Sequence, residues 1–363
     1  MRVLVTGATG FVGSWVARAL LSRGLEVRAL TRASSRLDNL RGLDLERAEG
    51  DVLDASAVAR ALRGCEGVVH TAGVVGWDPA DAARMHEVNG RGVEVVLGAA
   101  LEAGVSRAVL TSSVAVIGGA TAPRVADERT PSNAAQLGID YFASKLRGEE
   151  AARVLASRGL PVSIVRPAVV LGPGDVHRSS AALVLALARR SYPVFLEGGA
   201  SFCDVRDVAR GHVEALLRGR PGEVYVLGGH NLATSELIRR VSQLAGVEPP
   251  PRVPWPAALA AAQAAEWLAS LRGRRPRLTT QLVRASRLYS WVSSARAQAE
   301  LGYEIRPFEE SLRDTLRWFI AQGQLRPETA ELRALAAEEP RSAAGGGPAA
   351  PGAGVDARPS SSP

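Results

Sequence analysis

The chain opens on the stretch Met1-Arg-Val-Leu-Val-Thr-Gly-Ala-Thr-Gly-Phe-Val-Gly13, which decides the fold. The aliphatic residues 3–5 predict a strand buried on both faces, and Gly7 ends that strand in a tight turn. Apolar residues then recur at helical spacing over residues 11–23, and Gly24 predicts the end of that helix. Strand, glycine turn and helix form the arrangement that binds a pyrophosphate.

Each glycine of the turn has a role that a larger residue would block. Gly7 permits the turn, Gly10 lets the backbone approach the phosphates, and Gly13 lets the helix pack closely on the strand. The helix N-terminus offers free N–H groups and the positive end of its dipole to the anion. Glycines also end strands in proteins that bind no nucleotide, so the rest of the chain must support this interpretation.

Composition limits the classes of protein to consider. With 363 residues, 46% of them hydrophobic, the chain is long enough for about two domains with sizeable cores. Cys65 and Cys203 form no disulfide framework and no C-x-x-C pair, and the five histidines lack zinc-like spacing. We therefore expect a cytoplasmic protein without a metal site.

The positive charge of the chain raises the question of anionic partners. The net charge is +7, yet the arginines are dispersed and the one dense cluster is Arg272-Gly-Arg-Arg-Pro-Arg277, so we expect no nucleic-acid partner. Residues 257–271 are interrupted by Gln263 and Glu266 and are too short to span a bilayer. No signal peptide is expected either, because the first buried strand begins at residue 2. Beside the arginine cluster, residues 257–271 belong to a substrate lobe or rest on a membrane surface as a peripheral contact.

The end of the second predicted strand, residues 26–31, bears on the choice of cofactor. An acidic residue there would hold the ribose 2′-hydroxyl of NAD, whereas an arginine accommodates the 2′-phosphate of NADP. This chain has Arg32 there and no acid before Asp38. An arginine–phosphate contact contributes about 1.5–3 kcal/mol, enough to set a preference. We expect NADP(H), with NAD(H) as the second candidate; the alternative is that Arg32 is an ordinary surface arginine.

Strands and helices continue to alternate beyond this point. A third strand leads to Asp51-Val52, a fourth covers residues 67–73 and ends in Ala72-Gly73, and a long helix at residues 84–103 precedes a fifth strand at residues 107–111. Ligands bind outside the carboxyl ends of parallel strands, so these ends are expected to line a cofactor crevice. The predicted fold class is α/β, a Rossmann-type doubly wound parallel sheet with a smaller C-terminal lobe.

Candidate catalytic residues follow the fifth strand. Ser113 comes directly after it, and Tyr141 and Lys145 lie one turn apart on a helix that ends near residue 157. A lysine ammonium and a cationic nicotinamide ring would lower the pKa of a tyrosine from its usual value of about 10. Tyr141 would then exchange a proton with a substrate oxygen that Ser113 polarises, while hydride moves at the carbon.

Six motifs occur together over roughly residues 1–325. They are Thr6-Gly-Ala-Thr-Gly-Phe-Val-Gly13, Asp51-Val52, His70-Thr-Ala-Gly73, Thr111-Ser-Ser113, Tyr141-x-x-x-Lys145 and Arg166-Pro167 with Gly172-Pro-Gly174. In combination they resemble the extended short-chain dehydrogenases/reductases. Within this family the chain is similar to dihydroflavonol 4-reductases, 3β-hydroxysteroid dehydrogenases and a hopanoid-associated sugar epimerase.

The resemblance implies a role for each motif residue. Ser113, Tyr141 and Lys145 would be catalytic, with Lys145 also bonding the nicotinamide ribose. Pro167 would close over the nicotinamide. The remaining cofactor residues would be Gly7, Thr9, Gly10, Phe11, Val12 and Gly13 at the pyrophosphate turn, Arg32, Asp51 and Val52 on the adenosine side, and Ala72 and Gly73 near the cofactor ribose. Asn89 resembles an asparagine that the family places ahead of the active site, and helix packing explains it equally well.

Two departures narrow the expected reaction. Many sugar-nucleotide enzymes of the family carry tyrosine where this chain has Ile117, and the dehydratases carry an acidic pair where it has Val114-Ala115. We therefore expect NADP(H)-linked interconversion of a ketone and a secondary alcohol on a small molecule. The alternatives are a sugar or nucleotide-sugar epimerase that retains NAD and, from another class, a dinucleotide-binding regulator without chemistry.

The resemblance also implies how the chain is divided. Residues 1–175 would form the dinucleotide-binding core, with further core elements at residues 193–230. Residues 176–325 would form mostly the substrate-binding lobe and closing helices. Residues 340–363, rich in Ala, Gly, Pro and Ser, predict a disordered tail. A homodimer would form through the helices at residues 84–103 and 141–157.

Overall fold

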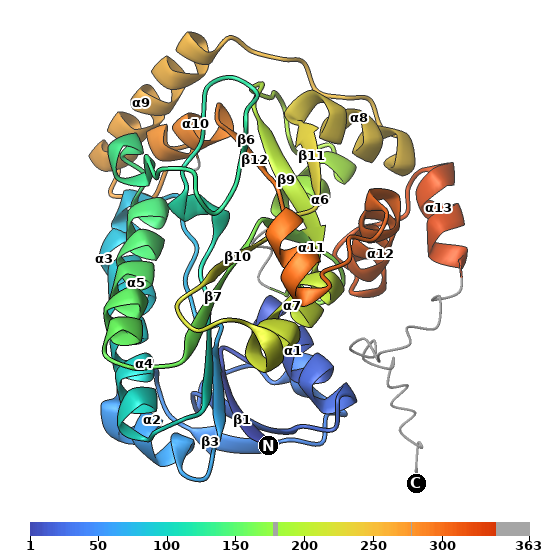
Figure 1. The fold of residues 1–363 in the computed structure, drawn as a ribbon. Helices are drawn as coiled ribbons and strands as arrows, with labels where there is room; N and C mark the ends of the chain where they lie inside the picture. The colour runs from blue at the N-terminus through green and yellow to red at the C-terminus, as the bar shows by residue number, and fades with distance from the viewer. Residues whose placement is uncertain (177–180, 277, 339–363) are drawn as a thin grey trace, which may run out of the picture.

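The fold is built on a sheet of seven parallel strands, seen in a computed structural model that describes residues 1–176, 181–276 and 278–338 (Figure 1). The order β10-β7-β5-β4-β1-β2-β3 reverses direction beside β1, as in a doubly wound fold. The strands are β1 (Arg2–Thr6), β2 (Glu26–Thr31), β3 (Glu46–Glu49), β4 (Gly67–His70), β5 (Arg107–Thr111), β7 (Val162–Pro167) and β10 (Val224–Leu227). The predicted fold class is confirmed.

Helices cover both faces of this sheet and bury its aliphatic residues. One face packs against α1 (Phe11–Ser22), α7 (Val205–Arg218) and α11 (Ala295–Leu301). The other packs against α2 (Ala55–Leu62), α4 (Gly92–Glu102) and α5 (Asp140–Ser157), with α3 (Ala82–His86) beside α5. Val3, Leu4 and Val5 are completely buried, as expected for a strand covered on both sides.

A second, smaller sheet lies beyond the carboxyl ends of the first (Figure 1). It runs in the order β11-β9-β12-β6, with β8 also paired to β9 and only β11 antiparallel to its neighbour. Its strands are β6 (Val125–Ala126), β8 (Val169–Leu171), β9 (Gly199–Asp204), β11 (His230–Ala233) and β12 (Tyr289–Val292). Around it lie α6 (Ala182–Ala188), α8 (Thr234–Ala245), α9 (Trp255–Leu271), α10 (Thr280–Ser286), α12 (Phe308–Ala321) and α13 (Ala330–Ala337).

The helix predicted at residues 84–103 is wrong in one respect. Residues 84–103 do not form one uninterrupted helix, because a π-helical turn at Glu87–Arg91 separates α3 from α4. The predicted tail at residues 340–363 lies outside the described residues. Among the described residues, no helix is both long and apolar enough to cross a bilayer.

Candidate active site and cofactor cleft

A cavity of about 680 Å³ lies at the carboxyl ends of the central parallel strands. Every site residue predicted from the sequence lines it: Gly7, Thr9, Gly10, Phe11, Val12, Gly13, Arg32, Asp51, Val52, Ala72, Gly73, Ser113, Tyr141, Lys145 and Pro167. The structure thus brings together residues that are up to 160 positions apart in the chain. Their individual roles stay predictions.

The glycine turn is too crowded for side chains at two of its positions. Gly7 has φ +70°, and a Cβ there would lie 2.6 Å from the backbone nitrogen of Ala72. A Cβ on Gly13 would collide with the carbonyl oxygen of Gly7, since α1 packs directly on the turn. The N–H of Gly10 donates to that same carbonyl (2.9 Å), and α1 begins at the next residue. These contacts leave the first N–H groups of α1 facing the cavity end of the sheet.

Arg32 follows β2 directly and lines the cavity. Its side chain is exposed and forms no ion pair with any residue that the structure describes. The neighbouring cations Arg36 and Arg41 both pair with Asp38, at 2.9 and 3.0 Å. Arg32 is therefore the cation of this segment that is available to an anionic ligand.

Asp51 shapes its own turn as well as lining the cavity. Its Oδ1 accepts a hydrogen bond from the N–H of Leu53 at 3.0 Å. The strand β3 ends at Glu49, so Asp51 and Val52 lie in the loop beyond it and not within the strand. That loop position suits contact with a flat ligand group lying over the edge of the sheet.

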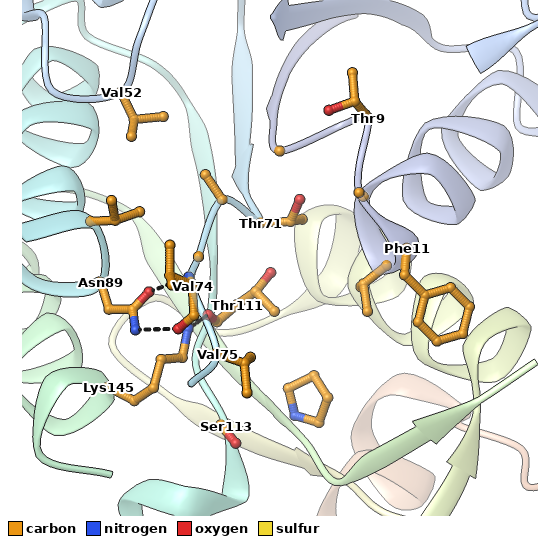
Figure 2. A pocket seen from close by; sticks show the side chains of 18 of the residues that line it. Thr9, Phe11, Val52, Thr71, Val74, Val75, Asn89, Thr111, Ser113 and Lys145 are labelled. Carbon is orange, nitrogen blue, oxygen red and sulfur yellow. Dashed lines mark hydrogen bonds between the residues drawn. The ribbon is translucent and has the colours of Figure 1, made fainter. Parts of the chain in front are cut away.

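Lys145 is partly buried beside the end of β5. Its ammonium group donates to the carbonyl oxygen of Thr111 at 2.8 Å, as Figure 2 shows. Burial lowers the pKa of Lys145 to about 8, and Glu149, one turn further along α5, offsets part of that effect. Lys145 therefore carries its charge at neutral pH and loses it as the pH rises through about 8.

Tyr141 lies one turn before Lys145 and packs edge-on against Trp77, with ring centroids 6.1 Å apart. Burial raises the pKa of Tyr141, and a hydrogen bond from Ser113 offsets only part of the rise. The sequence analysis expects a lowered pKa for Tyr141, from the lysine charge and a bound cationic nicotinamide ring. Burial of the phenol acts in the opposite direction and is not visible in the sequence. The ammonium of Lys145 is directed at Thr111, and the neutral phenol is the favoured form in this structure.

Ser113 begins the short 3₁₀ turn Val114–Val116 that follows β5. Its Oγ accepts from the N–H of Ala115 at 3.1 Å, which fixes the side chain at the N-terminus of the turn. The Ser113 hydroxyl also hydrogen-bonds the Tyr141 phenol, and both side chains line the cavity. Ser113 and Tyr141 can therefore act on one substrate oxygen.

A buried ion pair between Glu149 and Arg166 anchors α5 one turn beyond Lys145. The carboxylate of Glu149 accepts from the Arg166 guanidinium (3.0 Å from Nε) and from the Ser112 hydroxyl (2.8 Å). These contacts join α5 to β7 and to the end of β5, and they hold the pKa of Glu149 below its usual value. Glu149 is therefore negatively charged at neutral pH, close to Lys145.

Asn89 lies in the π-helical turn and clamps the loop after β4. Its Nδ2 donates to the carbonyl of Val74 (2.8 Å) and its Oδ1 accepts from the N–H of Val74 (2.8 Å), as Figure 2 shows. The Nδ2 also donates to the Ser144 hydroxyl (2.9 Å). The side chain is 1% exposed. All its hydrogen bonds are internal, so packing of the π-helical turn, loop and α5 accounts for it.

Two buried histidines beside the site could not be inferred from the sequence. His212 Nε2 accepts from the Thr111 hydroxyl (2.9 Å) while its Nδ1 donates to the carbonyl of Val208 (2.7 Å). His70 Nδ1 bonds the Thr6 hydroxyl at 2.7 Å. Burial lowers the pKa of His70 to about 3 and that of His212 to about 4, so both are neutral at pH 7. No local sequence motif indicates these contacts, because the two partners of each bond lie 64 and 101 residues apart in the chain.

The remaining polar residues of interest are structural. Asp204 caps α7 and pairs with Arg206 (2.8 Å), and Asp207, in the first turn of α7, pairs with Arg306 (3.0 Å). Ile117 lies outside the main cavity and lines a separate one of about 100 Å³. Within the described ranges, no group of three His, Cys, Asp or Glu side chains could hold a metal ion.

Residues 3–228 match the model of a family described as the NAD dependent epimerase/dehydratase family. The chain belongs to this family. The match spans the glycine turn, Ser113, Tyr141, Lys145 and Pro167, and the resemblance to extended short-chain dehydrogenases/reductases is confirmed. The protein is accordingly an NAD(P)-dependent enzyme, and the alternative of a regulator without chemistry is set aside.

Individual family members resemble the chain over most of its length. A Synechocystis protein named "Putative dihydroflavonol 4-reductase" is 33% identical, over 89% of this chain and 96% of its own. Sterol demethylase protein B of Methylococcus capsulatus is 32% identical, over 90% of this chain and 100% of its own. The crystal structure of gox2253 superposes with a TM-score of 0.79 at 39% identity, covering 89% of this chain and 99% of that one.

Proposed function

We propose that this enzyme is an NADP(H)-linked ketoreductase acting on a moderately apolar small molecule. The observation that carries the proposal is the placement of the partly buried Tyr141 phenol beside Ser113 and Lys145, in a cavity bordered by the unpaired Arg32. A phenol that keeps its proton at neutral pH is a general acid, which is what reduction of a carbonyl requires. The two relatives named above, a dihydroflavonol reductase by name and a sterol demethylase protein, support an apolar ring-containing substrate.

The residues of the cavity fit a dinucleotide phosphate. The turn at Gly7, Gly10 and Gly13 brings bare backbone to the N-terminus of α1, where a pyrophosphate would bind. Arg32 would bind the 2′-phosphate as a charge-assisted partner. When bound, NADPH supplies the hydride that reduces the carbonyl carbon.

The chain's own residues would supply the proton and orient the ketone. The Ser113 hydroxyl donates a hydrogen bond to the substrate oxygen, and Tyr141 transfers its proton to that oxygen as the C=O bond becomes C–OH. The charged Lys145 stabilises the phenolate that Tyr141 becomes. Thr111 holds the Lys145 ammonium in place, and solvent returns the proton to Tyr141 after the product leaves.

Apolar side chains form a large part of the cavity lining. They include Val74, Val75, Trp77, Val88, Ala168 and Val170. A nucleotide-sugar substrate would require polar partners for its hydroxyl and phosphate groups. This lining therefore supports a ketone on an apolar framework.

Replacing Arg32 tests the cofactor preference. Arg32→Ala should weaken NADPH binding roughly 10- to 150-fold, the equivalent of about 1.5–3 kcal/mol, and leave NADH binding almost unchanged. Arg36→Ala is the matched control, since Arg36 is bonded to Asp38 and does not line the cavity. Titration of both nucleotides by tryptophan fluorescence measures the effect. Equal affinity of wild type and Arg32→Ala for NADPH would contradict the proposal.

The second candidate is an epimerase that keeps NAD bound and regenerates it in each cycle. It is favoured by the family description, which names epimerases, and it would use the same three catalytic residues. Mass spectrometry of nucleotide released from the purified protein separates the two. Stoichiometric, non-exchanging NAD would move the epimerase to first place.

The quaternary structure and the division of the chain are also proposals. A homodimer through α4 and α5 is supported by Val154, which is 58% exposed on α5. The chain enters the second sheet with β8, shortly before the proposed division at residue 175, and the return of β10 to the first sheet supports core elements within residues 193–230. Sedimentation velocity tests the dimer.

A further inference from the structure

The outward face of α9 carries no charge. Within Trp255–Leu271 the one ionisable residue is Glu266, whose carboxylate accepts from the N–H and the hydroxyl of Thr280 at 2.8 and 3.1 Å. The exposed positions of the helix are mostly apolar: Ala257, Ala260, Ala261, Ala264, Trp267, Leu268 and Leu271. A surface helix of a water-soluble protein ordinarily turns charged side chains to solvent. The face therefore has a composition that suits a partner better than water.

Large side chains gather at the C-terminal end of this helix. Trp267 is 63% exposed, Leu268 42% and Leu271 65%. Trp267 and Leu271 lie one turn apart and are adjacent on the helix surface. We call these three residues the α9 patch. Figure 1 shows α9 at the outer edge of the molecule, with α10 beside it.

The inner face of α9 is already occupied. Ala262 is completely buried in a cluster with Leu196 and Val283. The α9 patch is therefore not required to fix the helix to the rest of the protein. Exposed tryptophan and leucine side chains on one helix end mark an interaction surface.

Two free positive charges follow the α9 patch directly. Arg272 and Arg274 are exposed, and neither forms an ion pair with any residue in the described ranges. Arg275, by contrast, is held by Asp81 at 2.8 Å and lies 3.8 Å from Asp78. The patch is uncharged, contains a tryptophan and is bordered by unpaired arginines. It is therefore complementary to a surface whose negative charges cover an apolar layer.

We propose that the α9 patch docks this protein on an anionic membrane surface. Trp267, Leu268 and Leu271 enter the headgroup region, and Arg272 and Arg274 bind lipid phosphates. Tryptophan favours this depth because its ring is apolar while its indole N–H remains hydrogen-bonded. A second copy of the chain fits less well, since a two-fold contact on this face would bring the unpaired arginines of both copies together.

The segment that follows the α9 patch is bonded to residues at the main cavity. Arg275 binds Asp81, and the Thr279 hydroxyl donates to the carbonyl of Trp77 at 2.7 Å. Trp77 lines the cavity and packs against Tyr141. The segment that connects α9 to α10 is therefore bonded to the cavity wall. The docking proposal does not depend on the proposed reaction.

Co-sedimentation of the full chain with vesicles tests the docking. Wild type should bind vesicles of phosphatidylcholine mixed with phosphatidylglycerol, bind pure phosphatidylcholine far less, and dissociate at high salt. Trp267→Ser/Leu271→Ser and Arg272→Glu/Arg274→Glu should each lower the partition coefficient roughly tenfold or more. All variants should keep the wild-type thermal unfolding midpoint, since the altered side chains are exposed.

Matched variants elsewhere on the surface control for charge and apolarity. Arg63→Glu/Arg326→Glu makes the same charge change at exposed arginines that pair with no described carboxylate. Val125→Ser/Val194→Ser removes two valines that are 55% and 41% exposed. Both should bind vesicles like wild type. Wild type left in the supernatant, equal binding by all variants, or a dimer that the α9 substitutions dissociate would each overturn the proposal.

Discussion

At the scale of single residues, burial decides which groups carry protons. The phenol of Tyr141 stays neutral because desolvation outweighs its bond with Ser113, whereas Lys145 keeps its charge at neutral pH although its pKa is lowered to about 8. A neutral acid beside a cation is the state required before a proton is given to a carbonyl oxygen. Tyr141 would meet this requirement in the proposed reduction.

Removal of one hydroxyl tests the role of Tyr141. Tyr141→Phe should lower kcat for ketone reduction by roughly 10²–10⁴-fold, with NADPH affinity unchanged, because the proton donor is lost and the ring contact with Trp77 is kept. Tyr289→Phe is the control, since Tyr289 lines the smaller cavity. Steady-state NADPH oxidation measures both. Unchanged turnover in Tyr141→Phe would exclude it as the acid.

At the scale of elements, the π-helical turn Glu87–Arg91 is the feature that positions the loop after β4. The sequence predicts a continuous helix there, since one extra residue in a turn barely alters an apolar periodicity. The contacts of Asn89 could not be predicted either, because its partners Val74 and Ser144 lie 15 and 55 residues away in the chain. The motif residues, by contrast, could be predicted because each follows a strand or opens a helix.

Truncation of Asn89 measures this clamp. Asn89→Ala should lower the free energy of unfolding by about 3 kcal/mol, since three buried hydrogen bonds are lost at about 1 kcal/mol each. Asn133 makes a similar pair of bonds to Gly119, at an exposed position. Asn133→Ala should therefore cost much less. Urea unfolding compares them, and equal losses would show that burial of the clamp is unimportant.

At the scale of the whole molecule, the first sheet is predictable and the second is not. The strands β1, β2, β4 and β5 are apolar runs separated by helices, a pattern visible in the sequence. The strands of the second sheet are two to six residues long. They also pair across large distances, as β12 does with β6. Such pairing depends on tertiary packing, as do the contacts of His212 and Trp77 in the site.

The buried neutral histidines predict sensitivity to acid. The pKa of His70 (about 3) and that of His212 (about 4) lie below the unfolded value of 6.5, so the unfolded state binds more protons below pH 6.5. Each histidine therefore removes about 2 kcal/mol of stability between pH 7 and pH 5. His212→Gln should reduce this pH-dependent loss by about that amount in urea unfolding. The same loss in wild type and variant would contradict the assignment.

The most direct test of the central claim is deuterium transfer from NADPH labelled at the nicotinamide C4 into a ketone. Dihydroflavonols and ketosteroids are the first substrates to assay, given the names of the relatives. We expect stoichiometric NADPH oxidation, with deuterium at the new carbinol carbon and loss of the transfer in Tyr141→Phe. Interconversion of epimers without net oxidation of nucleotide would contradict it.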